Sequence, residues 1–405
     1  MRKIITLVVL FLVSIVIVFG MTRFLRGSLI RTEVPDLARL RPATEQTIDD
    51  MVEDKLNTMS LDEKVAQLLI VQPSGTVLDD TLKWQLQTAP YGGVILMEVN
   101  YSTLAGTRSL VENIQSNAKT TMIISTDQEG GLVQRMDNIT DRSATNLPDM
   151  YQVGLKNDEE LAKEVGRVLA EELRTVGVNV DFAPVIDVYS NPYNQVIGTR
   201  SFSSNSQTVA KLGLAVAHGL EQHGVAATYK HFPGHGDTAT DSHLALPIIY
   251  KTYNQLKATE LVPFQAAIQD GAQLIMVGHI ALPQITGDNT PATLSAKITT
   301  DILRKDLGYD GLIVTDGLNM GALINNYPEA EIYYRAVEAG ADLLVLPLNP
   351  TLAMQSIKAH VSEERINQSV RRILKFKFEK LQNYQYLESS YFGSEEHAQV
   401  VNRIQ

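Results

Sequence analysis

The sequence predicts an α/β fold, a single (β/α)8 barrel of the TIM type. Eight short apolar runs rich in β-branched residues alternate with longer amphipathic segments between residues 67 and 382. Continuous apolar strands that alternate with helices indicate a parallel sheet covered on its outer side. Eight such units are the number that a (β/α)8 barrel requires. A doubly wound open sheet is the alternative that this pattern leaves open.

The apolar runs give the expected strands directly. They lie at residues 67–72, 92–97, 121–126, 178–188, 226–232, 273–280, 311–318 and 341–347. Helical periodicity fills most of the intervals, and the segments 158–177 and 252–271 both end in Gly, as helix C-caps do. Ser60 and Glu63 form a potential capping box before the first strand.

The N-terminus predicts a membrane anchor. Arg2 and Lys3 precede the run Ile4–Met21, which contains no charged residue. At 1.5 Å per residue this run would span about 27 Å as a helix, close to the thickness of a hydrocarbon core. A secretory signal has a shorter apolar region of about 7–15 residues. We therefore expect an uncleaved segment at 1–27 that holds the following domain outside the cytoplasm at the cell membrane; secretion after signal cleavage is the alternative.

Composition divides the rest of the chain into three parts. Residues 28–46 are polar, contain Pro35 and Pro42, and are typical of a linker. Residues 47–383 hold all eight expected strands and form the (β/α)8 domain. The remaining segment, 384–405, is too short for a further domain and is expected to be a C-terminal tail.

Charge and cysteine content exclude several classes of function. The net charge is -11, and the first 32 residues carry five basic and no acidic residues, so the body from Glu33 onward has 30 basic against 46 acidic residues. A nucleic-acid-binding protein needs the opposite field. The chain has no cysteine, which excludes disulfides, thiolate zinc sites and cysteine nucleophiles. Neither observation gives the oligomeric state.

Charged and imidazole side chains follow five of the expected strands. In a barrel of this class the carboxyl ends of the strands meet at one face, where active sites lie. We therefore expect one site at this face. The residues concerned are Asp127 after the third strand, Arg200 after the fourth, Lys230 and His231 at the fifth, His279 at the sixth and Asp316 at the seventh.

The stretch "KHFPGHGDTATDSH", residues 230–243, contains three of the eight histidines. Zinc ligation by His231, His235 and His243 is one interpretation. The intervening Pro233 and glycines break any helix that would align the first two. No G-x-x-x-x-G-K-[ST] phosphate loop is present.

A catalytic loop is the remaining interpretation of this stretch. Asp241 and His243 are two residues apart, so their side chains can form a hydrogen bond in an extended segment or a turn. A carboxylate beside an imidazole orients it and favours its protonated form, which suits a proton donor and acceptor near neutral pH. The spacing alone equally allows a structural Asp–His pair.

Four motifs together resemble glycoside hydrolase family 3, in particular its β-N-acetylhexosaminidase branch. They are "DQEGGLVQR" at 127–135, "IGTRSF" at 197–202, the 230–243 stretch and "VTDGLNM" at 314–320. The resemblance extends over residues 58–381. The departures are Leu132, where the branch usually has a basic residue, and Gly317 and Asn319, where many members have Asp and Ser.

The resemblance implies a retaining glycosidase that needs no cofactor or metal. By match to the family motifs, Asp316 is the nucleophile, His243 the general acid/base and Asp241 the partner of His243. The positions that hold the sugar match Asp127, Arg135, Arg200, Lys230 and His231.

The implied function is an exo-β-N-acetylglucosaminidase that removes terminal N-acetylglucosamine from peptidoglycan fragments or related glycans. The expected partners are this glycan and, through the N-terminal segment, a membrane. A β-glucosidase or a glycoside phosphorylase on the same scaffold, or a non-catalytic wall-binding protein, are the alternatives.

Overall fold

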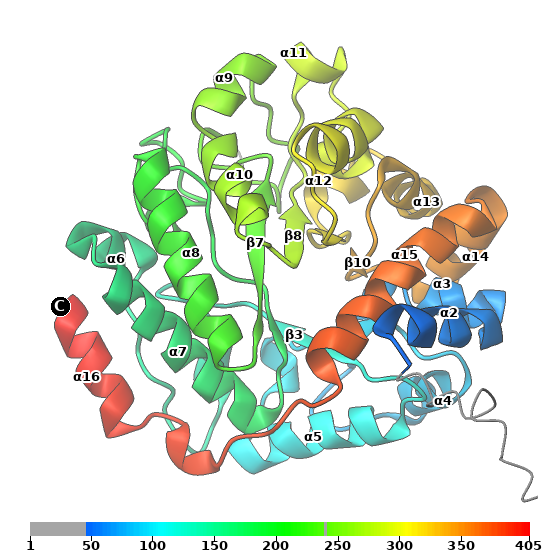
Figure 1. Ribbon diagram of the computed structural model, residues 1–405, viewed down its shortest axis with the longest axis horizontal. Helices are drawn as coiled ribbons and strands as arrows, with labels where there is room; N and C mark the ends of the chain where they lie inside the picture. The colour runs from blue at the N-terminus through cyan, green and yellow to red at the C-terminus, as the bar shows by residue number, and fades with distance from the viewer. Residues whose placement is uncertain (1–45, 239–240) are drawn as a thin grey trace, which may run out of the picture. The chain divides into compact units, whose positions relative to one another are not determined.

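The computed structural model describes residues 46–238 and 241–405 (Figure 1). The body from Ile48 to Gln405 is built around eight parallel strands in the order β10-β1-β2-β3-β6-β7-β8-β9. The two outermost strands also approach each other. The N–H of Leu343 donates to Ile313 O at 3.1 Å, and the N–H of Thr315 donates to Leu343 O at 2.9 Å. The sheet is therefore nearly closed, as the (β/α)8 prediction requires and the open-sheet alternative does not.

Each of the eight expected strands contains an observed strand of the sheet. The fourth is much shorter than its apolar run, because Pro184 has no N–H to donate to a ladder. The strands are β1 (Leu69–Val71), β2 (Gly93–Ile95), β3 (Ile123–Thr126), β6 (Val180–Asp181), β7 (Ala226–Phe232), β8 (Leu274–Val277), β9 (Leu312–Thr315) and β10 (Leu344–Val345). A small antiparallel pair, β4 (Gln128–Gly130) and β5 (Val133–Gln134), follows β3.

Helices cover the outer side of the sheet (Figure 1). The longer α-helices are α2 (Ile48–Thr58), α4 (Asp80–Thr88), α5 (Leu104–Asn117), α7 (Glu159–Val176), α8 (Ser206–Gln222), α10 (Leu261–Gln269), α13 (Glu329–Ala339), α14 (Pro350–His360), α15 (Glu363–Phe376) and α16 (Glu395–Ile404). The short α-helices are α3 (Leu61–Ala66), α6 (Met150–Lys156), α9 (Tyr253–Ala258), α11 (Pro283–Thr286) and α12 (Gly321–Ile324). Two π-helical segments, η6 (Lys297–Asp306) and η7 (Lys377–Leu381), complete the cover, with 3-10 turns η2 (Glu98–Asn100), η3 (Arg135–Asn138), η4 (Gly198–Arg200), η5 (Ala292–Leu294) and η8 (Ser389–Tyr391).

Local signals in the sequence set the ends and the packing of several helices. The capping box expected at Ser60 and Glu63 is present at the start of α3. Gly177 ends α7 in the left-handed conformation, with φ 92°. Helices α7 and α8 pack side by side at Gly166 and Gly219, where an added Cβ would lie 2.0 and 2.1 Å from backbone oxygens of the opposite helix. Only glycine permits this approach.

The expected membrane anchor lies outside the described residues. Between Gln46 and Gln405, leaving out the gap at 239–240, no helix combines the length and the apolar character that a membrane span needs. The run 4–21 belongs to the part of the chain that the structure does not describe.

The C-terminal tail packs on the barrel. Helix α16 lies against α7 and α6 (Figure 1). It inserts His397, which is fully buried, between two glutamates of α7. The His397 Nε2 atom lies 2.8 Å from Glu171 Oε2, and Nδ1 lies 3.5 Å from Glu172 Oε1. Burial opposes a charge on the imidazole, but the two carboxylates outweigh burial and raise the pKa of His397 to about 9.

This raised pKa makes part of the stability depend on pH. The protonated imidazole is favoured in the folded chain, so its contribution is fully present below the unfolded pKa of about 6.5 and is lost as pH rises through 9. We expect the free energy of unfolding of wild type to exceed that of His397→Gln most at pH 6, and the difference to shrink by pH 9.5. Urea denaturation of both proteins measures this difference, and a gap that stays constant or widens contradicts the assignment.

Candidate active site

A cavity of about 220 Å³ opens at the carboxyl ends of the strands. Its lining comes from β2, β4, β5, β7, β8 and β10 and from the segments that follow β3, β6, β7 and β9. The structure brings seven of the eight predicted site residues to its wall and leaves Asp241 just behind, bonded to His243. The seven are Asp127, Arg135, Arg200, Lys230, His231, His243 and Asp316.

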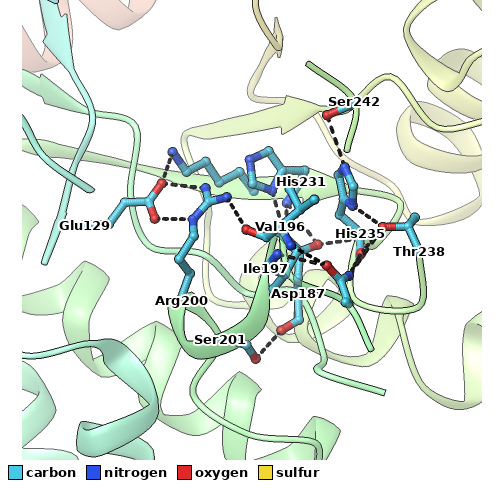
Figure 2. A network of polar contacts seen from close by, with 12 residues as sticks. Glu129, Asp187, Val196, Ile197, Arg200, Ser201, His231, His235, Thr238 and Ser242 are labelled. Carbon is cyan, nitrogen blue, oxygen red and sulfur yellow. Dashed lines mark hydrogen bonds and ion pairs between the residues drawn. The ribbon is translucent and has the colours of Figure 1, made fainter. Parts of the chain in front are cut away.

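A buried ion-pair cluster forms one wall of the cavity. Lys230, at the end of β7, places its Nζ 2.7 Å from Asp127 Oδ1 and 2.6 Å from Glu129 Oε1. Arg200 binds Glu129 through two bonds of 2.7 Å each, in the bidentate geometry of Arg–carboxylate pairs (Figure 2). Glu129 and Lys230 are 4% and 2% exposed. Two cations and two carboxylates from three strand ends therefore compensate one another inside the barrel.

The cluster keeps its members charged. Burial raises the pKa of Glu129, but Arg200 and Lys230 outweigh burial and hold it well below its usual range. Burial lowers the pKa of Lys230, while Asp127 and Glu129 raise it, with a net upward shift. Asp181, which is fully buried at the end of β6, behaves differently: burial raises its pKa well above the ordinary value. The wall thus offers fixed charged donors and acceptors to polar groups of a ligand.

Asp187 orients the histidine on the adjacent strand. Its carboxylate is fully buried and accepts from His231 Nδ1 at 2.7 Å, which leaves Nε2 as the free ring nitrogen. The backbone N–H groups of His231 and His235 also donate to it, at 3.2 and 2.6 Å (Figure 2). Burial raises the pKa of Asp187, but the two histidines lower it below its usual range. One ionised carboxylate therefore fixes both the end of β7 and the start of the following loop.

The loop after β7 carries His235, His243 and Asp241 in separate environments. His235 is buried, with Nδ1 2.7 Å from Thr238 Oγ1 and Nε2 3.2 Å from Ser242 Oγ (Figure 2). Burial and the neighbouring His231 lower the pKa of His235 to about 4. Among residues 46–238 and 241–405 no group of three side chains is placed to hold a metal ion, so the three histidines of the 230–243 stretch form no such group.

His243 is exposed at the cavity mouth and is held by Asp241. The Asp241 Oδ1 atom accepts from His243 Nδ1 at 2.8 Å and from the His243 N–H at 2.9 Å. Burial raises the pKa of Asp241, but these bonds and the imidazole lower it. The hydrogen bond that the spacing allowed is thus present, and it leaves Nε2 of His243 available at the cavity.

Asp316 lies directly after β9 and faces the same cavity. Its Oδ1 accepts from the N–H of Gly317 at 2.8 Å. Burial raises the pKa of Asp316, yet His231, His279, the Gly317 N–H and Lys230 together lower it to about 2. The carboxylate is therefore ionised over the whole neutral range. His279 is buried behind it and bonds to Thr293 Oγ1 and Gly317 O, at 2.7 and 2.9 Å, so it supports the segment instead of lining the cavity.

Arg135 provides an unused donor at the cavity wall. Its Nη1 lies 2.7 Å from Glu98 Oε1. Its Nε is buried and has no hydrogen-bond partner within the described part of the chain. A buried N–H without a partner costs about 1–3 kcal/mol.

Sequence reasoning missed Glu129 and Asp187, which hold the predicted residues in place. Both stood inside motifs that were recognised, two residues after Asp127 and near the end of the fourth apolar run. A signal was available, because the predicted cations Arg200 and Lys230 need anionic partners if they are buried. The sequence did not show which carboxylate would meet them.

Comparison with known proteins identifies the family. The model of the glycosyl hydrolase family 3 N-terminal domain matches residues 60–376. A β-hexosaminidase of Thiobacillus denitrificans is 36% identical over 291 residues, which cover 70% of this chain and 79% of the relative. A β-hexosaminidase A of Pseudoalteromonas piscicida is 35% identical over 302 residues, 68% of this chain but only 50% of the relative. The chain thus spans half the length of that protein.

A solved structure agrees with these matches. The glycoside hydrolase family 3 β-N-acetylglucosaminidase of Paenibacillus sp. superposes with a TM-score of 0.79 at 35% identity, over 86% of this chain and 68% of that one. The chain belongs to glycoside hydrolase family 3, which confirms the resemblance seen in the sequence, and it is a glycoside hydrolase.

Removal of the shared carboxylate should be costly. Glu129→Ala leaves Arg200 and Lys230 short of a buried counter-charge, and breaking a buried pair costs about 3–5 kcal/mol. The matched control is Glu98→Ala. It removes the ion-pair partner of Arg135, but the Glu98 side chain is 50% exposed, and an exposed ion pair contributes about 1 kcal/mol or less to stability. Urea denaturation compares the two, and equal losses contradict the central position given to Glu129.

Proposed function

We propose that this glycoside hydrolase is a retaining exo-β-N-acetylglucosaminidase. One observation carries the proposal. A single cavity is lined by Asp316, an ionised carboxylate at a strand end, and by His243, an imidazole oriented by its own carboxylate. This pairing supplies a nucleophile and a proton carrier. The names of the relatives, β-hexosaminidase and β-N-acetylglucosaminidase, support the choice of sugar.

The first step forms a covalent glycosyl-enzyme. An Asp316 oxygen attacks the anomeric carbon and forms a bond to it, while the bond from that carbon to the glycosidic oxygen breaks. His243, protonated at Nε2, gives this proton to the departing oxygen, so that the aglycone leaves as a neutral alcohol. Asp241 stabilises the imidazolium before the transfer and holds its ring.

The second step releases the sugar. The now neutral His243 accepts a proton from a water molecule, whose oxygen attacks the anomeric carbon from the opposite side to Asp316. The bond to Asp316 breaks, its carboxylate is restored, and His243 regains its proton. Two inversions give net retention of configuration. The low pKa of Asp316 suits both steps, because it marks a stable leaving carboxylate that is always ionised at the start.

The charged wall supports recognition of one terminal sugar. Asp127, Lys230 and Arg200 offer charge-assisted hydrogen bonds to hydroxyls, and the Arg135 guanidinium lines the same cavity. A cavity of about 220 Å³ holds a single sugar ring better than a long glycan, which fits exo action. We further propose peptidoglycan fragments as the natural substrate and an N-terminal segment, 1–27, that anchors the domain outside the cytoplasm. The uncharged run 4–21 supports the second point.

The activity test compares two chromogenic substrates. Nitrophenyl β-N-acetylglucosaminide should be hydrolysed with release of the β-anomer of the sugar, whereas nitrophenyl β-glucoside should react far more slowly. The assay is run with and without inorganic phosphate, since a phosphorylase would produce the sugar 1-phosphate. Preference for the glucoside, or phosphate-dependent turnover, contradicts the proposal. Cell fractionation of full-length protein tests the anchor.

Replacement of the nucleophile should abolish turnover. Asp316→Asn removes the charge that attacks the anomeric carbon but keeps the shape of the side chain, and nucleophile variants lose several powers of ten in kcat, about 10⁴-fold or more. Folding should be retained, as circular dichroism and thermal denaturation can show. A variant that keeps more than a few per cent of wild-type activity on the nitrophenyl substrate contradicts the assignment of Asp316.

Replacement of His243 should separate the two steps. Proton transfer contributes about 10²–10⁴-fold to a rate, but nitrophenolate departs readily without a proton. His243→Ala should therefore cripple cleavage of the β-1,4-linked disaccharide of N-acetylglucosamine, while still forming the glycosyl-enzyme from the nitrophenyl substrate. The expected signature in stopped-flow measurements is a burst of nitrophenolate, a lowered KM and acceleration by azide with a β-glycosyl azide product. Equal losses on both substrates would remove His243 from the acid/base role.

A further inference from the structure

The loop that carries His243 rests on the segment that follows β9. The N–H of Gly321 donates to His243 O at 3.1 Å, and the N–H of Ala322 donates to Ser242 O at 3.0 Å. Asn325 Nδ2 adds a bond of 3.3 Å to Leu244 O. The first N–H groups of a helix have no partner within it. Two of these groups in α12 bind loop carbonyls, and the Asn325 side chain, just after α12, binds the next carbonyl of the loop.

The same segment begins at Asp316, the proposed nucleophile. Gly317 O accepts from His279 Nε2 at 2.9 Å, and the N–H of Leu318 donates to Val345 O at 2.9 Å. Leu318 is 1% exposed and Met320 is 7% exposed. A short, hydrogen-bonded stretch of chain, in which Gly317, Leu318 and Met320 are buried, thus connects the nucleophile to the contact surface of the loop.

Gly321 is the residue at which this contact tolerates no side chain. An added Cβ would lie 2.6 Å from His243 O and 2.8 Å from Leu244 O, with Asn325 Nδ2 at 3.0 Å. The two closest atoms belong to loop backbone, which cannot rotate away as a long side chain can. A methyl group here must push the loop outward by some tenths of an ångström, even though alanine suits a helix better than glycine does.

We propose that Gly321 is a positioning residue for the reaction: its bare backbone seats the His243 loop against the segment that carries Asp316. The proposal rests on the proposed function, since it acts through His243 as the acid/base. A second bond holds the loop from its own base, because buried His235 contacts Ser242 Oγ at 3.2 Å. The contact between Gly321 and the loop carbonyls, called here the seat, then sets the distance between His243 and Asp316 across the cavity. A displacement of about 1 Å in such a distance can cost ~10²-fold in rate.

The test is Gly321→Ala, measured with substrates of poor and good leaving groups. We expect kcat/KM for the β-1,4-linked disaccharide of N-acetylglucosamine to fall at least ~10-fold, part of the full loss that removal of an acid catalyst brings. The burst rate of nitrophenolate release should change little, and azide should accelerate the steady state. A purely structural defect would lower both substrates together and give no azide effect.

Two further variants make the test specific. Gly75→Ala is the matched control, because Gly75 follows β1 at the same face of the barrel and an added Cβ meets no atom within 4 Å. It should leave both substrates unchanged. Asn325→Ala removes the third bond from an exposed side chain and should show the pattern of Gly321→Ala more weakly, by a few-fold, in line with a net hydrogen-bond contribution of about 0.5–1.5 kcal/mol. If Gly321→Ala does not fold, Asn325→Ala still tests whether the contact between α12 and the loop positions His243.

His243→Ala, assayed beside these variants, separates the acid/base role of His243 from the positioning role of Gly321. If His243→Ala shows the leaving-group pattern but Gly321→Ala and Asn325→Ala do not, the seat is disproved and the proposed function stands. If His243→Ala itself lacks the pattern, the acid/base assignment and the seat both fail. The leaving-group pattern in all three, with none in Gly75→Ala, supports both.

Discussion

The site depends on a buried charge balance centred on Glu129. Its carboxylate binds Lys230 and both nitrogens of a bidentate Arg200, so that the ends of β3 and β7 and the loop after β6 are joined at one point. Buried charges are tolerated only when they are paired and hydrogen-bonded. The pairing therefore fixes these side chains in orientation, and it leaves their outer faces directed at the cavity. A rigid array of donors and acceptors is what recognition of a hydroxyl-rich ligand requires.

A second carboxylate extends this order from the sheet to the catalytic loop. Asp187 binds the His231 ring and the N–H of His235, which are respectively the last part of β7 and the first part of the loop. Gly236 follows, where an added Cβ would lie 1.7 Å from Val188 O. The loop base is thus packed as closely as the core. Its far end meets α12 at Gly321, so the segment carrying His243 is bound at both ends although the imidazole itself is exposed.

The folded body extends beyond the residues that match the family's N-terminal domain model. The match ends at residue 376, yet the chain continues through η7 and closes with α16 on α7. His397 is buried there between two glutamates. Lys377 is buried at the end of the strands opposite to the cavity, where its Nζ donates to Gln67 Oε1 at 2.7 Å. Burial lowers the pKa of Lys377 to about 7. These groups lie away from the cavity and concern stability.

The sequence by itself determined the strands, the barrel class and most of the charged and imidazole residues at the cavity. Periodicity was sufficient for the strands because each is a short apolar run between amphipathic segments, and the carboxyl ends of parallel strands must meet at one face. The Asp241–His243 bond followed from two residues of spacing. What only the tertiary structure decided are the contacts between distant segments: Glu129 with Arg200, Asp187 with His231, and Gly321 with His243. These pairs are separated by 71, 44 and 78 residues, and no local pattern encodes which buried carboxylate meets which cation or where a methyl group has no room. They are set by the packing of the nearly closed sheet, which brings strand ends close to one another regardless of their order along the chain.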